Sequence, residues 1–363
     1  MKKYKSNLPA QTSLVWIVIM CCTMFFLSNR IMNGDDSFFD EDGGGNTFTF
    51  QVVSLKFGIH VDVVLNEWDS DIEKIDSHSF RRLNVPGLGV SGSVGRPELP
   101  VWRRLIEVPL NAAGVKATVT SMSAEPALVD GKSTGEPLYP VQPPVEKVPG
   151  AKPAPLVWDR AYYARTGKTD AVPVEVSHFG IQRGRNLYLV SVYPFEYTPA
   201  SSALTVRTAL SFDVSWSCES SVPQWRASRY RSLLLEQPLA PVLLNEEGTK
   251  DGFAGYPAGL LIIAAPSFFN DPNLADYVAW KNQRGLHTTL VSTAETGATA
   301  TAIRDYIQNA YDTWDIPPSF LLLVGDTDTI PHWTGGGSDS PPTDLNYALL
   351  DGTEWNTPDI WCG

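Results

Sequence analysis

The residues best suited to chemistry lie in an acidic segment near the end of the sequence. Asp351, Glu354 and Asp359 fall within nine positions of one another, Asn356 lies between them, and Asp326 follows an apolar run upstream. Oxygen ligands of this kind suit calcium, although the segment lacks the spacing and flanking helices of an EF-hand. Asp, Asn and Gly are also the usual residues of turns. Spacing alone favours a solvated turn over a calcium site, and both interpretations stay open.

A histidine and a cysteine in the same region carry side chains that catalyse reactions in many enzymes. His332 lies in the loop after Asp326, where it could act as a general base. No cysteine or serine with the sequence context of a nucleophile accompanies it, so we expect a solvated loop histidine. Cys362 lies in a short predicted strand at residues 359–362, where burial would raise the pKa of its thiol and leave it inert. Neither residue is predicted to be catalytic.

Strand-like and helix-like segments alternate around these residues. Apolar runs of strand length occupy residues 260–264, 287–291 and 320–324, and helical patterns occupy residues 273–284 and 303–314. Strands and helices that alternate with short connections predict a right-handed, parallel α/β sheet covered by helices. Functional sites on such sheets lie at the carboxyl ends of the strands. The loop after residue 326 belongs to that edge.

The glycines of this half do not form a nucleotide-binding motif. Pro266 and Ser267 follow the first apolar strand in place of a glycine-rich turn, and no P-loop lysine follows Gly335, Gly336 and Gly337. The sequence therefore argues against a dinucleotide or P-loop site. We interpret the three glycines as a mobile loop.

Residues 47–220 have the composition of an all-β region. Short runs of β-branched and aromatic residues alternate with Gly and Pro, and in the clearest strand, residues 204–216, every second side chain is apolar apart from Thr208. One face of that strand is therefore expected to be buried. Prolines crowd residues 137–155, and because proline lacks a backbone donor we expect an extended surface arm there. The region is predicted to be a β-rich, sandwich-like domain.

The N-terminus is typical of an export signal. Lys2, Lys3 and Lys5 precede an apolar run at residues 14–27, which is short for a membrane span. We predict a signal peptide or an uncleaved anchor at residues 1–30. A flexible acidic and glycine-rich leader is expected at residues 31–46. The protein is accordingly predicted to be secreted or held at the cell surface.

The charge balance of the chain limits its partners. The 363 residues carry a net charge of −12, and 43% of them are hydrophobic. This length and apolar content predict about two to three globular domains. The negative charge argues against nucleic acid as a partner, because affinity for phosphates comes mostly from Lys and Arg. Cys218 and Cys362 lie too far apart to indicate a disulfide framework.

Several stretches resemble a known family. In order along the last third of the chain they are LIIAAPSF, YVAWKNQRGL, AIRDYIQNAYDTW, FLLLVGDTDTIP and TDLNYALLDGTEWNTPDIWCG. Upstream, a Gly-x-Pro-x-x-Pro step appears as GRPELPVWRRLIEVPLNA at residues 95–112. Together they resemble gingipain-type cysteine peptidase precursors of family C25, with a propeptide followed by the N-terminal part of the catalytic domain.

The resemblance implies a caspase-like α/β domain that cleaves peptide bonds with a Cys and His dyad. It also implies that the β-rich prodomain aids folding and inhibits the peptidase from within the same chain. Both dyad residues lie on later strands of that family than this sequence contains, so no catalytic residue is assigned here and the fragment is expected to be inactive. Protein or peptide substrates and the chain's own prodomain are the implied partners.

A structural calcium ion is also implied by the resemblance. Family members hold one between the aspartate of the LLVGD motif and the turn before the next strand. The corresponding ligands here are Asp326, the carbonyl of Asp351, Glu354, the carbonyl of Asn356 and Asp359. One residue is inserted near the last two positions relative to the family pattern. With the resemblance added, calcium is favoured over a solvated turn.

The predicted architecture is therefore a β-rich propeptide at residues 47–220, a linker at residues 221–257 and a truncated caspase-like domain at residues 258–363. Precursor processing is expected in the exposed linker, with Arg226, Arg229 and Arg231 as candidate sites if the enzyme cleaves after basic residues. A basic patch that binds an acidic surface is the alternative for these arginines. The whole protein could instead be a non-catalytic surface or adhesion protein with a pseudo-peptidase domain. A small-molecule-binding α/β domain fused to a β-sandwich is the remaining alternative, and it lacks the required phosphate loop.

Overall fold

The structure is a computed structural model that describes most of the chain beyond the N-terminal segment. The described residues are 4–5, 47–127, 135–145, 150–152, 154–169, 172–220, 223–236, 238–245, 257–336, 340–352 and 357–363. Apart from residues 4–5, the predicted signal and leader lie outside them. The chain forms two compact units, one of Met1–Arg103, Ala117–Glu175 and Ser191–Ser215, the other of Arg104–Lys116, Val176–Val190 and Trp216–Gly363. The second unit thus contains the whole α/β region together with two segments of the β-rich region.

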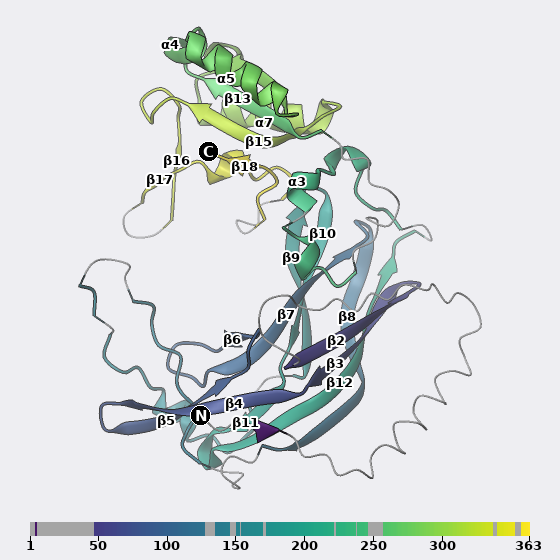
Figure 1. Cartoon of the computed structure of the whole chain (residues 1–363), viewed down its shortest axis with the longest axis vertical. Helices are drawn as coiled ribbons and strands as arrows, with labels where there is room; N and C mark the ends of the chain where they lie inside the picture. The colour runs from purple at the N-terminus through teal and green to yellow at the C-terminus, as the bar shows by residue number, and fades with distance from the viewer. Residues whose placement is uncertain are drawn as a thin grey trace. The chain divides into compact units, whose positions relative to one another are not determined.

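Strands dominate the chain up to residue 218, which confirms the β-rich prediction (Figure 1). The sheets have the strand orders β1-β4-β5, β6-β7-β10-β9 and β11-β12-β3-β2, and β8 pairs with β12 outside the last of these paths. The strands are β1 (Tyr4–Lys5), β2 (Phe48–Leu55), β3 (Gly58–Leu65), β4 (Glu67–Ile75), β5 (His78–Asn84), β6 (Gly89–Ser91), β7 (Leu99–Val108), β8 (Ala112–Pro126), β9 (Val174–Gln182), β10 (Arg185–Val192), β11 (Phe195–Thr198) and β12 (Ala203–Cys218).

The core of the first unit joins strands from all three sheets. One cluster of buried side chains includes Leu65 of β3, Leu83 of β5, Leu99 of β7, Phe195 of β11 and Leu204 of β12. Strand β12 shows the predicted alternation, since the side chains at its even-numbered positions from 204 to 214 are buried apart from a half-buried one at 208. Buried faces of several sheets that share one core make this unit sandwich-like, as predicted.

The proline-rich arm is anchored to the first unit in its described part. Residues 137–145 form no strand, in agreement with the lack of backbone donors at proline. Isolated bridges nevertheless pair Leu138 with Arg81 and Pro140 with Pro97, and the side chains of Leu138 and Tyr139 are buried. The short helical elements up to residue 245 are α2 (Arg160–Tyr163), η1 (Pro199–Ser201), η2 (Ser228–Tyr230), α3 (Leu233–Glu236) and η3 (Ala240–Val242).

The last third of the chain forms the predicted parallel α/β sheet. Its strand order is β14-β13-β15-β18, and each neighbouring pair is parallel. The final strand is shorter than expected and covers two residues. The elements are β13 (Gly259–Ala264), α4 (Pro266–Phe269), α5 (Pro272–Gln283), β14 (His287–Ser292), α6 (Thr293–Thr296), α7 (Ala300–Thr313), β15 (Pro318–Val324), β16 (Trp333–Thr334), β17 (Pro342–Thr343), η4 (Leu345–Tyr347) and β18 (Trp361–Cys362).

Local signals in the sequence explain where the two longer helices begin and end. The Asp271 side chain caps α5, proline occupies the first turn, and the chain leaves the helix through Gly285, whose φ is 87°. Thr299 caps α7 in the same way. Helix α7 buries Ile303 and Ile307 against one face of the sheet, where Leu261 and Leu321 belong to the same cluster. The apolar stripe read from the sequence is therefore the face that packs on the sheet.

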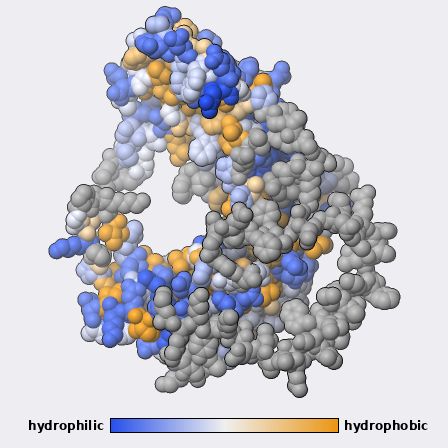
Figure 2. All heavy atoms as spheres, in the orientation of Figure 1, coloured by the Kyte–Doolittle hydropathy of each residue, from blue (hydrophilic) through white to orange (hydrophobic). Residues whose placement is uncertain are grey.

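The surface of the described residues is mixed in character. Figure 2 shows hydrophobic and hydrophilic residues interspersed over the visible face. Phe268 and Trp280, on α4 and α5, are 44% and 48% exposed. Within the described part of the chain, no helix combines the length and the apolar character that crossing a membrane requires.

Candidate functional site

Asp326 lies in a turn directly after β15, at the carboxyl edge of the sheet as predicted. Its Oδ1 accepts a hydrogen bond from the backbone N–H of Thr327 at 2.7 Å, and its carbonyl accepts from the N–H groups of Thr329 and Ile330. The residue is exposed. Its side chain therefore closes its own turn through one carboxylate oxygen.

Asp359 is a buried acceptor of backbone hydrogen bonds and lies just before β18. Its Oδ2 accepts from the N–H groups of Leu350 at 2.6 Å and Asp351 at 2.8 Å, and its Oδ1 accepts from the N–H of Arg183 at 2.6 Å. The residue is 2% exposed. Burial raises the pKa of this carboxyl group to about 6, against the opposing effect of the N–H of Arg183.

Asp351 lies beside Asp359 and binds the same hairpin. Its Oδ2 accepts from the hydroxyl of Tyr311 at 2.7 Å and from the backbone N–H of Gly184. Burial and the nearby carboxylates raise the pKa of the Tyr311 hydroxyl well above its usual range, so the tyrosine stays a donor. Two carboxylates of the α/β region therefore accept the two N–H groups of the β9–β10 turn.

The side chain of Arg183 extends from this turn to a group of polar atoms. Its Nε donates to the carbonyl of Tyr230 at 2.7 Å, and its Nη1 donates to the carbonyls of Pro318 at 2.8 Å and Asp359 at 3.3 Å. Its Nη2 donates to the Ser319 hydroxyl at 2.9 Å. Burial lowers the pKa of the guanidinium, while the neighbouring tyrosine and aspartates oppose that shift. All these residues belong to the second compact unit.

The described members of the predicted calcium site only partly fit a cation. Asp359 directs its carboxylate at three N–H donors, and such donors repel a cation at the same position. The part of the chain that the structure describes holds no group of three or more His, Cys, Asp or Glu side chains that could bind a metal ion. Glu354 and Asn356 lie outside the described residues. Calcium stays a prediction, and the geometry does not favour the Asp359 carboxylate as one of its ligands.

His332 and Cys362, whose side chains could catalyse reactions, are not among the described residues that form hydrogen bonds with Asp359 and Arg183. His332 is exposed, just before β16, as expected for a solvated loop histidine. Cys362 lies in β18, and shielding of its thiol raises the pKa to about 12. The residue as a whole is exposed, which differs from the buried strand position that we expected. At neutral pH the sulfur is protonated and therefore a poor nucleophile.

Among the candidate processing arginines, Arg226 is buried, which differs from the expected position in an exposed linker. Arg226 donates to Glu236 through Nη1 at 2.8 Å and Nη2 at 2.6 Å, and Arg185 also contacts Glu236. Burial alone would raise the pKa of Glu236, but its arginine partners outweigh burial and lower it. Arg226 is 8% exposed, whereas Arg229 and Arg231 are half-buried. Cleavage after Arg226 would require this segment to open.

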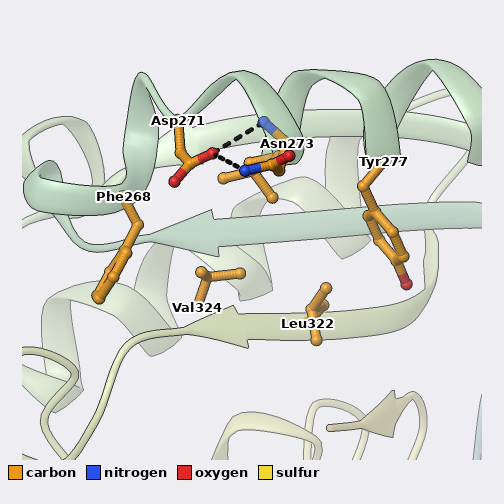
Figure 3. Close-up of a pocket in the computed structure, with 7 residues that line it drawn as sticks. Phe268, Asp271, Asn273, Tyr277, Leu322 and Val324 are labelled. Atoms are coloured by element: carbon orange, nitrogen blue, oxygen red, sulfur yellow. Dashed lines mark hydrogen bonds between the residues drawn. The ribbon is translucent and has the colours of Figure 1, made fainter.

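A second concave region lies on the α4–α5 face of the sheet. The cavity has a volume of about 390 Å³, and its lining is mostly apolar (Figure 3). Asp271 is already engaged there as the helix cap, since its Oδ1 accepts from the N–H and the Nδ2 of Asn273 at 2.8 and 3.0 Å. We interpret the cavity as a packing gap. It is lined by Phe268, Asp271, Asn273, Leu274, Tyr277, Leu322 and Val324.

Two family models match the chain in adjacent regions. Residues 63–230 match the C25 propeptide, and residues 254–363 match peptidase family C25. The chain carries a gingipain-type C25 propeptide followed by part of a C25 catalytic domain. The propeptide match extends to Tyr230 and so includes the arginines at positions 226 and 229, which the sequence had placed in a linker.

Curated relatives of this C25 precursor come from Porphyromonas gingivalis. Lys-gingipain is 30% identical over 286 residues, which cover 76% of this chain and 16% of the relative. Gingipain R2 is 29% identical over 150 residues, which cover 39% of this chain and 20% of the relative. The chain thus spans about a sixth to a fifth of the length of these relatives.

Solved structures of the same kind of protein also match. A structure of gingipain K from P. gingivalis, which concerns its zymogenic latency, aligns with a TM-score of 0.40 and 25% identity over 47% of this chain and 94% of the other. The Arg-specific cysteine proteinase gingipain R aligns with a TM-score of 0.26 and 27% identity over 29% of this chain and 24% of the other.

The propeptide hairpin that binds the catalytic-domain segment was not predicted from the sequence. Arg183 and Gly184 follow β9 and precede β10, and a glycine in a two-residue connection between strands is a hairpin signal. That signal could have located the turn. It could not have located the partners at positions 318, 319 and 359, because they lie more than a hundred residues away.

Proposed function

We propose that the chain is the front part of an exported cysteine endopeptidase precursor, in which the propeptide is an intramolecular inhibitor and folding aid. The observation that carries this proposal is the docking of the β9–β10 hairpin. Gly184 and Arg183 belong to the propeptide match, and their N–H groups bind Asp351 and Asp359 of the peptidase match. A propeptide segment that is buried against the peptidase segment is what an intramolecular partner requires.

The proposed chemistry is thiol-based peptide hydrolysis. A cysteine thiolate attacks the carbonyl carbon of the scissile bond, a histidine transfers a proton to the leaving amine, and backbone donors stabilise the oxyanion. The C–N bond breaks and a thioester forms, which water then hydrolyses to release the acid and restore the thiol. We propose that this dyad lies beyond Gly363, as the resemblance to family C25 implies, and the exposed loop position of His332 and the raised pKa of the Cys362 thiol support the proposal. The role proposed for residues up to 363 is to build the sheet and hold the propeptide.

The test is to express the complete reading frame beyond residue 363 and assay it on peptide substrates. We expect hydrolysis that depends on one downstream cysteine and is lost when that cysteine is changed to alanine. The 363-residue chain should be inactive in the same assay. If the complete protein has no downstream Cys and His pair and hydrolyses nothing, the alternative of a surface or adhesion protein with a pseudo-peptidase domain replaces this proposal.

Calcium is proposed as a structural ion, with Asp326, the Asp351 carbonyl, Glu354 and the Asn356 carbonyl as ligands. It is supported by the exposed Asp326 carboxylate, which lies on the turn after β15. When bound, the ion would tie this turn to the segment before β18. Calcium should raise the melting temperature of the chain, and magnesium should not. Asp326→Asn should reduce the rise in melting temperature caused by calcium, and Asp328→Asn should not. An equal reduction in the two variants would contradict the proposed site.

Export is proposed from the N-terminal Lys-rich and apolar segment alone. The expected result is that a fusion of residues 1–46 directs a reporter out of the cytoplasm of a Gram-negative host. Replacing the apolar run at residues 14–27 with a polar sequence of equal length should retain the reporter inside. Equal export of both fusions would contradict the proposal.

A further inference from the structure

Arg183 occupies a backbone conformation that an arginine rarely adopts. Its φ is 49° and that of Gly184 is 71°, so both residues of the β9–β10 connection are left-handed. A two-residue turn of this kind usually takes Asn, Asp or Gly at its first position, and the backbone of another residue there is strained. An observed strain of this kind calls for a contact that compensates it. The side chain of Arg183 is the place to find that contact.

The guanidinium group of Arg183 is enclosed by acceptors from three separate segments. They are the carbonyl of Tyr230, the carbonyl of Pro318 with the hydroxyl of Ser319, and the carbonyl of Asp359. Arg183 and Ser319 are 4% and 0% exposed. The planar fork of a guanidinium matches acceptors spread around its edge, whereas an ammonium group cannot reach them all.

Two tyrosines complete the enclosure. The ring of Tyr311 lies 5.7 Å from the guanidinium carbon of Arg183, and the ring of Tyr230 stacks on that of Tyr311 with 4.8 Å between centroids. Aromatic faces attract a guanidinium through cation–π interaction. The Tyr311 hydroxyl binds Asp351, which in turn accepts the N–H of Gly184. The same pocket thus contacts both the side chain and the backbone of the hairpin.

We propose that the second unit contains a guanidinium-binding site, built from the carbonyls of Pro318 and Asp359 and the hydroxyl of Ser319, with Arg183 as its bound ligand in the precursor, where the carbonyl of Tyr230 is a fourth acceptor. The ligand class is the side chain of a peptide arginine. This inference rests on the proposed function in one respect: the propeptide has to leave for the site to accept an arginine from another peptide.

The test uses the intact chain and a small molecule that replaces the deleted side chain. Arg183→Ala should lower the melting temperature, and ethylguanidinium chloride at millimolar concentration should restore part of the loss. Ethylammonium chloride at the same ionic strength should bind roughly tenfold more weakly, because it cannot donate to all four acceptors. The wild-type chain should not respond to either salt, because Arg183 already occupies the site.

Two variants separate this site from a general effect of the salts. Arg183→Ala combined with Ser319→Ala removes one acceptor and should reduce the affinity for ethylguanidinium. Arg284→Ala, which removes an exposed arginine after α5, should show no guanidinium-dependent stabilisation. If Arg183→Ala does not fold, Arg183→Lys with hydrogen exchange at residues 180–186 provides the readout, and faster exchange there than in the wild type is expected.

Either of two results would overturn the inference. One is an equal response of Arg183→Ala to ethylguanidinium and ethylammonium. The other is unchanged exchange in the hairpin of Arg183→Lys. Neither result depends on peptide hydrolysis, so the guanidinium site can fail while the proposed peptidase function stands, and the reverse also holds.

Discussion

At the scale of single residues, Asp359 combines burial with three backbone hydrogen bonds. The N–H donors stabilise its charged form, but the loss of hydration on burial has the larger effect and raises the pKa of the carboxyl group to about 6 from its usual value of 3.8. A raised carboxyl pKa means that the native state binds more protons than the unfolded state between these two pH values. Ionisation of Asp359 therefore lowers stability as the pH rises through this window.

The corresponding prediction compares the wild-type chain with Asp359→Asn in urea unfolding at several pH values. The free energy of unfolding of the wild type, minus that of the variant, should fall as the pH rises from about 4 to about 6, by up to roughly 3 kcal/mol. Asparagine does not titrate, so the other carboxyl groups cancel in the difference. A difference that stays constant or rises across this window would contradict the raised pKa.

At the scale of elements, the β9–β10 hairpin depends on Gly184. A Cβ at this position would lie 3.1 Å from the Cβ of Arg226 and 3.4 Å from Cδ2 of Tyr230, in addition to the strain of a φ of 71°. Gly114 offers a matched control, because its φ is 63° and a Cβ there would meet nothing within 4 Å. Both glycines thus share the backbone strain, and only one has the close contacts.

We expect Gly184→Ala to destabilise the chain more than Gly114→Ala. Backbone strain should lower the free energy of unfolding of each variant by about 1 kcal/mol. The close contacts at position 184 should lower that of Gly184→Ala by about 1 kcal/mol or more in addition. Thermal or urea unfolding of the two variants measures the difference. Equal losses would mean that segment 226–230 moves aside freely, and that the hairpin is not packed against it.

Helix α7 supports the same site through one hydroxyl. Tyr311→Phe removes the donor to Asp351 but keeps the ring, so the free energy of unfolding should fall by about 1–2 kcal/mol. Tyr306→Phe, on the same helix, removes an exposed hydrogen bond to Glu295 and should change stability by less than about 0.5 kcal/mol. Urea denaturation of both variants tests this, and an equal effect would show that the buried hydroxyl has no special role.

The elements were largely predictable from the sequence, whereas the contacts between them were not. Periodicity located α7 because Ile303 and Ile307 must share the face that packs on the sheet, and Gly285 ended α5 by its backbone freedom. The oxygen-rich segment was recognised as a ligand source, yet an oxygen that can bind calcium can equally accept an N–H. At Asp359 the carboxylate accepts the N–H groups of Leu350 and Asp351 nearby and of the distant Arg183, and no local pattern reveals the last of these contacts.

At the scale of the whole molecule, the route to maturation depends on how firmly residues 223–245 are held. The sequence predicts a basic, exposed linker here. The ion-pair partner of Arg226 is Glu236, ten residues further along the chain, and this spacing gives no local sign that the two side chains pair. In the structure Glu236 contacts two arginines whose side chains are each 4% exposed. Removing the charge of Glu236 would leave both buried guanidinium groups with Glu107, at 3.5 Å from Arg185 and 3.8 Å from Arg226, as their carboxylate partner, and the loss of the closer carboxylate is destabilising.

Glu236→Gln should therefore open this segment to proteases. We expect trypsin to cleave after Arg226 slowly in the wild type and at least roughly tenfold faster in the variant, as followed by mass spectrometry over time. Glu196→Gln is the matched control, because it weakens a comparable pair with Arg207 in the first unit and should leave cleavage after Arg226 unchanged. If the two variants are cleaved there at the same rate, the Glu236 pair does not protect the segment. If Glu236 does protect Arg226 from cleavage, the propeptide has to be released first. Processing after Arg226 would then follow that release and would not start it.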